Sequence, residues 1–177
     1  MRIISGKHRG KILLSPKHNI RPTLDKVKQA IFTRLQFQIK GARVLDLFAG
    51  SGALGIEALS RNAGEVIFCD SDKQSAQLIK ENLKAVKEEA KVIIADYKTA
   101  LKTLDGKFDL ILLDPPYKAG YYDDALQIIW DRNLLSEDGV IVCEREKNEK
   151  INNQVFELDC SKFYGSVAVD YFIKRNR

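Results

Sequence analysis

The residues with the clearest chemical potential are Asp114-Pro115-Pro116-Tyr117. Consecutive prolines have fixed φ angles and lack N–H donors, so they predict a rigid loop with free carbonyl oxygens. Asp114 and the Pro115 carbonyl can therefore accept hydrogen bonds from an exocyclic amine, while the Tyr117 ring can stack on a base. The loop is suited to amino-group methylation, in which positioning and stabilisation of the charge developing on nitrogen lower the barrier.

A second motif is the glycine-rich turn that follows an apolar run at residues 44–48. It contains Gly50-x-Gly52-x-x-Gly55, a pattern compatible with NAD or with S-adenosylmethionine. Asp46, four residues before Gly50, would repel a pyrophosphate but suits the ammonium and sulfonium groups of S-adenosylmethionine. A role for Asp46 limited to capping the turn through backbone amides is the alternative.

Two further carboxylates strengthen the cofactor interpretation. Asp70 ends the apolar run at 65–70 and is expected to accept hydrogen bonds from ribose hydroxyls. Asp96 follows the run at 91–95 and is placed to receive an adenine amino group. Three successive predicted strands thus end in an aspartate, a pattern more specific than the glycines, and it favours S-adenosylmethionine over NAD.

The elements that must position these residues alternate along the chain. Apolar runs predict strands at 44–48, 65–70, 91–95, 108–113 and 139–144, with helices at about 53–60, 73–87 and 121–130, and an antiparallel pair at 155–159 and 167–173. This alternation predicts an α/β Rossmann-like domain with a mostly parallel sheet and helices on both faces. The run 144–150 is interpreted as a solvated, mixed-charge segment.

A helix is also predicted from Thr23 to about residue 39. Its apolar residues recur at helical spacing and are expected to pack on the sheet. Its basic residues Lys26, Lys28 and Arg34 are expected to face solvent.

Composition indicates one globular domain of 177 residues, with 45% hydrophobic and 30% charged residues. No apolar run approaches the roughly 18 to 20 residues that span a bilayer, and the N-terminus lacks a signal-peptide core, so a cytoplasmic location is expected. Cys69, Cys143 and Cys160 are widely spaced and are interpreted as core residues, with no metal site.

The charge distribution points to a nucleic-acid partner. Residues 1–40 carry ten Lys and Arg against one acid, a net charge of +9, whereas the other 137 residues carry 19 basic and 23 acidic side chains, a net charge of −4. Residues 1–22 are predicted to form a small basic β-hairpin extension in front of a catalytic core at 23–177. The residues predicted to contact RNA phosphates are Lys7, His8, Arg9, Lys11 and Arg21. A merely solvated basic surface is the alternative.

The sequence resembles the bacterial small-subunit (16S) ribosomal RNA guanine-N2 methyltransferase family, the RsmD-like group. The resemblance rests on the opening R-I-I-S-G-K-H-R-G-K, on Arg21-Pro22-Thr23-x-Asp25, on the glycine turn and on the Asp114 loop. It implies a seven-stranded class I methyltransferase fold and a substrate RNA within an assembling small subunit. It implies S-adenosylmethionine at Asp46, Gly50, Gly52, Asp70 and Asp96, and a flipped guanine at Asp114, Pro115 and Tyr117.

Three other functions compete with this one. Adenine-N6 methylation of DNA or RNA would use the same Asp114 loop, although the basic arm is short for sequence readout of DNA. A non-catalytic RNA-binding assembly factor would need the RNA surface but not the acids. A dehydrogenase is disfavoured by Asp46.

Overall fold

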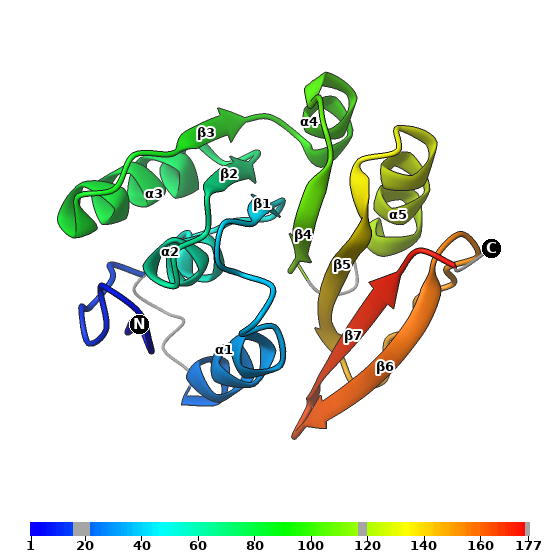
Figure 1. The fold of residues 1–177 in the computed structure, drawn as a ribbon, viewed down its shortest axis with the longest axis horizontal. Coiled ribbons are helices and arrows are strands. Elements are labelled where there is room, and N and C mark those ends of the chain that lie inside the picture. Colours follow the sequence, from blue (N-terminus) through cyan, green and yellow to red (C-terminus); the bar gives the residue numbers. More distant parts are fainter. Residues whose placement is uncertain (16–21, 117–119, 176–177) are drawn as a thin grey trace.

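The computed structural model describes residues 1–15, 22–116 and 120–175. A seven-stranded sheet has the order β3-β2-β1-β4-β5-β7-β6 (Figure 1). Strands β1 to β5 are parallel, and β7 is antiparallel to both β5 and β6, which confirms the predicted mostly parallel sheet. The strands are β1 (Arg43–Asp46), β2 (Glu65–Asp70), β3 (Lys91–Ile94), β4 (Phe108–Leu113), β5 (Leu135–Glu146), β6 (Glu157–Tyr164) and β7 (Val167–Ile173). The helices are α1 (Pro22–Arg34), α2 (Ala53–Ser60), α3 (Lys73–Val86), α4 (Tyr97–Thr103) and α5 (Tyr121–Asp131).

Helices cover both faces of the sheet, with α1, α2 and α3 on one side and α4 and α5 on the other (Figure 1). Each face has its own apolar cluster, and neighbouring residues of a strand divide between them: Val44 joins the first cluster and Leu45 the second. Nearly continuous apolar strands are needed because both faces are buried. This alternation also decides which face each strand-end acid occupies.

Residues 1–15, the described part of the predicted hairpin, do not form its strands. One isolated antiparallel bridge joins Arg2 and Ile12, while Ile3 and Leu13 are buried in the first apolar cluster. The Glu57 carboxylate of α2 accepts hydrogen bonds from the backbone N–H groups of Ile4 and Ser5 at 2.8 and 3.0 Å. Around this bridge the Ile3 N–H donates to the Lys11 carbonyl and the Leu13 N–H to the Met1 carbonyl, and Glu57 holds the backbone that follows.

The prediction that Lys28 faces solvent is wrong. Its Nζ donates a hydrogen bond to the Arg2 carbonyl at 2.6 Å and lies 3.8 Å from Glu57 Oε2, with only 3% of the residue exposed. Burial lowers the pKa of Lys28, and the Glu57 carboxylate opposes that shift. Lys26 and Arg34 are exposed, as expected. Among the described helices, none is long and apolar enough to cross a membrane.

Candidate functional site

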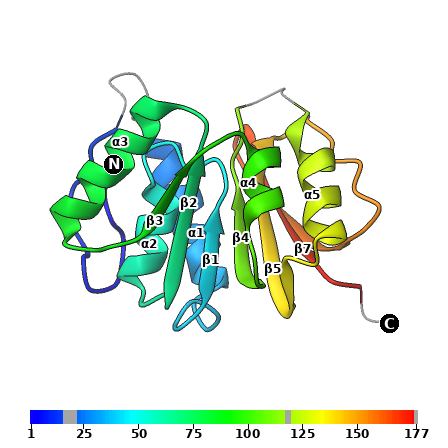
Figure 2. The same cartoon turned by 90° about the horizontal axis from the view of Figure 1, so that it is seen from above.

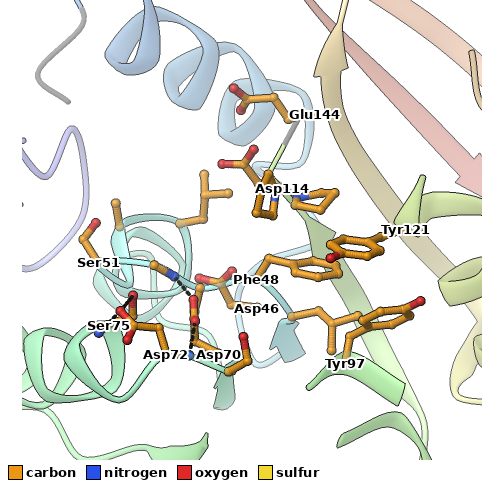
Figure 3. A pocket seen from close by; sticks show the side chains of 18 of the residues that line it. Asp46, Phe48, Ser51, Asp70, Asp72, Ser75, Tyr97, Asp114, Tyr121 and Glu144 are labelled. Carbon is orange, nitrogen blue, oxygen red and sulfur yellow. Dashed lines mark hydrogen bonds between the residues drawn. The ribbon is translucent and has the colours of Figure 1, made fainter. Parts of the chain in front are cut away.

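A cavity of about 1100 Å³ opens at the carboxyl ends of the parallel strands (Figure 3). This is the edge at which open α/β sheets bind ligands. Its lining includes most of the described site residues predicted from the sequence: Asp46, Gly50, Asp70, Asp96, Asp114 and Pro115. The structure thus brings together residues from four strand ends that span 70 positions of sequence. Tyr117 and Arg21 lie outside the described residues.

Asp46 is buried at the end of β1 and contributes to both the turn and the cavity. Its Oδ2 accepts a hydrogen bond from the Gly55 N–H at 2.9 Å, so the predicted alternative of turn capping does occur. Burial, with smaller contributions from the charges of Asp114 and Asp70, raises the pKa of Asp46 to about 7, and the Gly55 bond opposes the shift. A cation in the cavity would stabilise the ionised form of this carboxyl.

The three glycines of the turn have different roles. Gly50 has a φ of +54°, and a Cβ there would meet nothing within 4 Å, so this position leaves space at the cavity. Gly52 has a φ of +78° and lies directly before α2. A Cβ on Gly55 would lie 2.2 Å from Phe68 Cε1, which makes this glycine necessary for packing α2 on β2. Of the three, Gly50 is the one that lines the cavity.

Asp70 and Asp96 reach the cavity from the ends of the next two strands. Asp70 accepts hydrogen bonds from the N–H groups of Gly50 at 2.8 Å and Asp72 at 2.9 Å. Asp96 caps the short helix α4, accepting from the Thr99 N–H at 3.0 Å and the Thr99 hydroxyl at 2.6 Å, and these bonds lower its pKa. Each oxygen that accepts one such bond keeps capacity for a second donor, such as a ribose hydroxyl or an adenine amine.

Three aromatic rings that the sequence analysis did not single out form one wall of the cavity. The Phe48 and Tyr121 rings are stacked with centroids 5.8 Å apart and planes 3° apart, and Tyr97 packs against both (Figure 3). The Tyr97 hydroxyl donates a hydrogen bond to Asp124 Oδ2 at 2.7 Å. Phe48 lies shortly after β1, Tyr97 directly follows Asp96 and Tyr121 begins α5. These positions near strand ends are the sequence feature that could have identified the three rings. Such a wall suits a planar heterocycle.

Asp114 and Glu144 lie next to each other on the first-cluster face of the sheet (Figure 3). Leu113 of β4 pairs in register with Cys143 of β5, and both point to the second apolar cluster, so the residues that follow them point the other way. Burial raises the pKa of Asp114, and burial together with the Asp114 charge raises the pKa of Glu144.

Glu144 overturns the prediction of a solvated segment at 144–150. Strand β5 continues to Glu146 between β4 and β7, so Glu144 is only 4% exposed. Within the described part of the chain, its Oε1 has no hydrogen-bond partner. A buried acceptor without a partner at a cavity is suited to a donor from a ligand.

The described residues predicted to bind RNA lie on the opposite side from this cavity, where the parallel strands begin. Lys7 donates its N–H to the carbonyl of Ser60, the last residue of α2, and the N-terminal segment runs down beside α3 and α2 to that side (Figure 2). Lys7 Nζ and His8 Nε2 both contact Glu88 Oε1, at 2.7 and 2.6 Å. Arg9 and Lys11 are exposed. Their role in RNA binding stays a prediction.

The cavity fits a cationic, adenosine-containing group. Carboxylates from β1, β2 and β4 surround one volume, and an aromatic wall faces it. Desolvation disfavours ionisation of both Asp46 and Asp114, and repulsion by Asp114 adds to this at Asp46, so a positive ligand charge gains a favourable interaction there.

Comparisons with known proteins give one consistent picture. A family model described as "Conserved hypothetical protein 95" matches residues 1–173. The chain is 39% identical over 183 residues to the Bacillus subtilis protein "Putative rRNA methyltransferase YlbH", covering 99% of this chain and 100% of that protein. It is 38% identical to the Haemophilus influenzae "Ribosomal RNA small subunit methyltransferase D", covering 85% and 81% of the two chains. The solved structure of the Escherichia coli "Putative methyltransferase yhhF" superposes with a TM-score of 0.89 at 31% identity, over 100% and 99% of the two chains.

Proposed function

We propose, since the chain belongs to the RsmD-like (conserved hypothetical protein 95) family of class I S-adenosylmethionine-dependent methyltransferases, that it methylates the exocyclic N2 amine of one guanine in small-subunit (16S) ribosomal RNA. The names of the relatives support ribosomal RNA as the substrate. The observation that carries the proposal is Asp114, which lies at the end of β4 in the same cavity as Asp46, Gly50 and Asp70.

The cofactor would lie on the side of the cavity formed by β1, β2 and α4. Asp46 and the Gly50 backbone would face its charged end, Asp70 its ribose and Asp96 its adenine, with the aromatic wall beside them. When bound, S-adenosylmethionine supplies an electrophilic methyl group. The Gly50 N–H donates to Asp70, so the turn and the ribose-binding acid are fixed together before any ligand arrives.

Asp114 and the Pro115 carbonyl would bind and orient the amine. Hydrogen bonds from the amine to these acceptors reduce conjugation of its lone pair with the ring and aim that lone pair into the cavity. They also stabilise the positive charge that develops on nitrogen. Burial raises the pKa of Asp114, so this carboxylate can take the proton that the methylated nitrogen loses.

The target base must leave its stack to reach the end of β4. Extrusion costs a few kcal/mol, and least where the nucleotide is already unpaired. We propose an assembling small subunit as the substrate, because the resemblance to the RsmD-like family implies one. Arg9 and Lys11 would add contacts to phosphates at a distance from the reacting base.

The test is transfer of labelled methyl from S-adenosylmethionine to unmodified small subunits, to naked ribosomal RNA and to duplex DNA, with nucleoside analysis of the products. We expect N2-methylguanosine from subunits or ribosomal RNA, formed about 10²-fold or more slowly with Asp114→Ala. N6-methyladenine as the product would replace this proposal by an adenine-N6 methyltransferase. RNA binding without transfer to any of these substrates would reject it.

A further inference from the structure

Asp114 and Glu144 are neighbouring carboxyl groups of the cavity that have no part in the proposed cofactor contacts. Asp114 has an assigned partner in the target amine, whereas Glu144 has none. Glu144 is 4% exposed and lines the cavity, and its Oε1 lacks a hydrogen-bond partner in the described residues. Burying a carboxylate without donors is costly, which favours a role in ligand binding over packing.

The sheet fixes the direction and the spacing of the two carboxylates. They follow the register pair Leu113–Cys143 on adjacent parallel strands, which lie about 4.8 Å apart. Both side chains project to the same face, so together they present neighbouring acceptors to one ligand edge (Figure 3). Lys28 of α1 also lines the cavity, but its Nζ donates to the Arg2 carbonyl and lies 3.8 Å from Glu57 Oε2.

Two neighbouring acceptors match guanine and oppose adenine. The Watson–Crick edge of guanine presents the N2 amine and the N1–H, two adjacent donors, and flipped bases are read by hydrogen bonds to this edge. Adenine instead presents the N6 amine beside an unprotonated N1, whose lone pair would face a carboxylate. We infer that Glu144 is a specificity-determining residue that accepts the guanine N1–H while Asp114 accepts an N–H of the N2 amine.

This inference rests on the proposed function and identifies Glu144 as the residue that selects guanine. An N1–H donor would supply the missing partner of Glu144 and stabilise its ionised form. Burial and the Asp114 charge raise the pKa of Glu144 in the free protein, and this donor would oppose both effects. The Glu144 backbone carbonyl already accepts a hydrogen bond from the Tyr122 hydroxyl, which holds this part of β5 in place.

The test replaces guanine at the mapped target position by 2-aminopurine, which keeps the amine but has an unprotonated N1. Small subunits would be reconstituted with ligated 16S RNA carrying either base. For the wild-type protein, we expect kcat/KM to be at least about 100-fold higher for guanine than for 2-aminopurine. In Glu144→Gln, the amide N–H can donate to that N1, so the ratio should fall at least about tenfold.

Two controls separate the possible failures. Glu146→Gln changes an acid two residues further along β5 that also lines the cavity, and it should keep the wild-type ratio. Titration with S-adenosylmethionine should give the wild-type affinity for Glu144→Gln, which shows that the variant is folded. Methylation of guanine with the same base ratio in wild type and Glu144→Gln would overturn this inference alone. A wild-type protein that methylates no guanine would overturn the proposed function.

Discussion

Asp70 Oδ2 accepts a hydrogen bond from the backbone N–H of Gly50 at 2.8 Å, which joins the end of β2 to the glycine turn after β1. The residues are 20 positions apart, yet one contact fixes the conformation of the turn and the orientation of the predicted ribose acceptor. Asp70 Oδ1 is held in turn by the Asp72 N–H at 2.9 Å. The part of the cavity proposed to bind the cofactor is therefore preorganised by its own acids.

Substitution of Asp70 should weaken cofactor binding. We expect Asp70→Ala to lower the affinity for S-adenosylmethionine by about 10- to 100-fold, because hydrogen bonds to a charged acceptor are worth about 1.5–3 kcal/mol. Asp70→Asn keeps one acceptor oxygen and should lose less. Isothermal titration calorimetry measures both, with Asp131→Ala on the exposed end of α5 as the control. Equal affinities for wild type and Asp70→Ala would contradict the assignment.

Asp46 should make the stability of the ligand-free protein depend on pH. Its pKa rises from about 3.9 in the unfolded chain to about 7 in the folded protein, so folding favours the protonated acid. The wild-type free energy of unfolding should therefore fall, relative to Asp46→Asn, as pH rises from about 4 to about 7. The full shift corresponds to at most about 4 kcal/mol.

Urea unfolding of both proteins at pH 5 and pH 8 measures this difference. Asn keeps an acceptor for the Gly55 N–H, so Asp46→Asn should be the more stable protein at pH 8 and lose most of that advantage at pH 5. The same variant should bind S-adenosylmethionine more weakly, since it lacks the negative charge. An advantage of equal size at both pH values would exclude Asp46 as its source.

Asp114 should separate cofactor binding from catalysis. Asp114→Ala removes the acceptor for the target amine but none of the expected cofactor ligands, so kcat should fall by about 10²-fold or more. The dissociation constant for S-adenosylmethionine should change by no more than a few-fold. Single-turnover methyl transfer and calorimetry give the two values. A parallel loss of affinity and rate would instead place Asp114 in the cofactor site.

The acids Asp46, Asp70, Asp96 and Asp114 could be predicted because the carboxyl ends of parallel strands meet at one side of the sheet. For each acid it was therefore enough to recognise the strand that precedes it. Glu144 ends the predicted strand 139–144 but was assigned to the charged run 144–150 that begins with it, whereas its burial depends on β5 pairing with both β4 and β7. The position of Lys28 likewise depends on Glu57, which lies 29 residues away on α2. Local sequence patterns therefore failed for Glu144 and Lys28, because the burial of each side chain depends on residues of other elements.

Glu57 should anchor the N-terminal segment. Its carboxylate is fully buried and accepts hydrogen bonds from the N–H groups of Ile4 and Ser5 and from Arg61 Nε, with Lys28 nearby. Glu57→Ala leaves these donors without their acceptor and removes a negative charge beside the buried Lys28, so it should lower the free energy of unfolding by about 3–5 kcal/mol. Hydrogen exchange should also accelerate at residues 2–5.

The matched control for Glu57 is Asp159, whose ion pair with Arg34 is exposed. Asp159→Ala should lower the free energy of unfolding by less than about 1 kcal/mol, because solvent screens surface pairs. Urea denaturation provides both values. Similar losses in the two variants would show that the burial of Glu57 has no energetic consequence.

The basic residues near the N-terminus should affect RNA affinity and leave the chemical step unchanged. Arg9 and Lys11 lie at the sheet edge opposite Asp114, so Arg9→Ala and Lys11→Ala should each reduce the salt slope of RNA binding by up to about one, with kcat unaltered at saturating RNA. Lys7→Ala should have a smaller effect, because Glu88 already neutralises Lys7 in the free protein. Filter binding over a salt series distinguishes these variants. An unchanged slope for Arg9→Ala and Lys11→Ala would make this edge a solvated surface, and RNA would then have to bind by the cavity side alone.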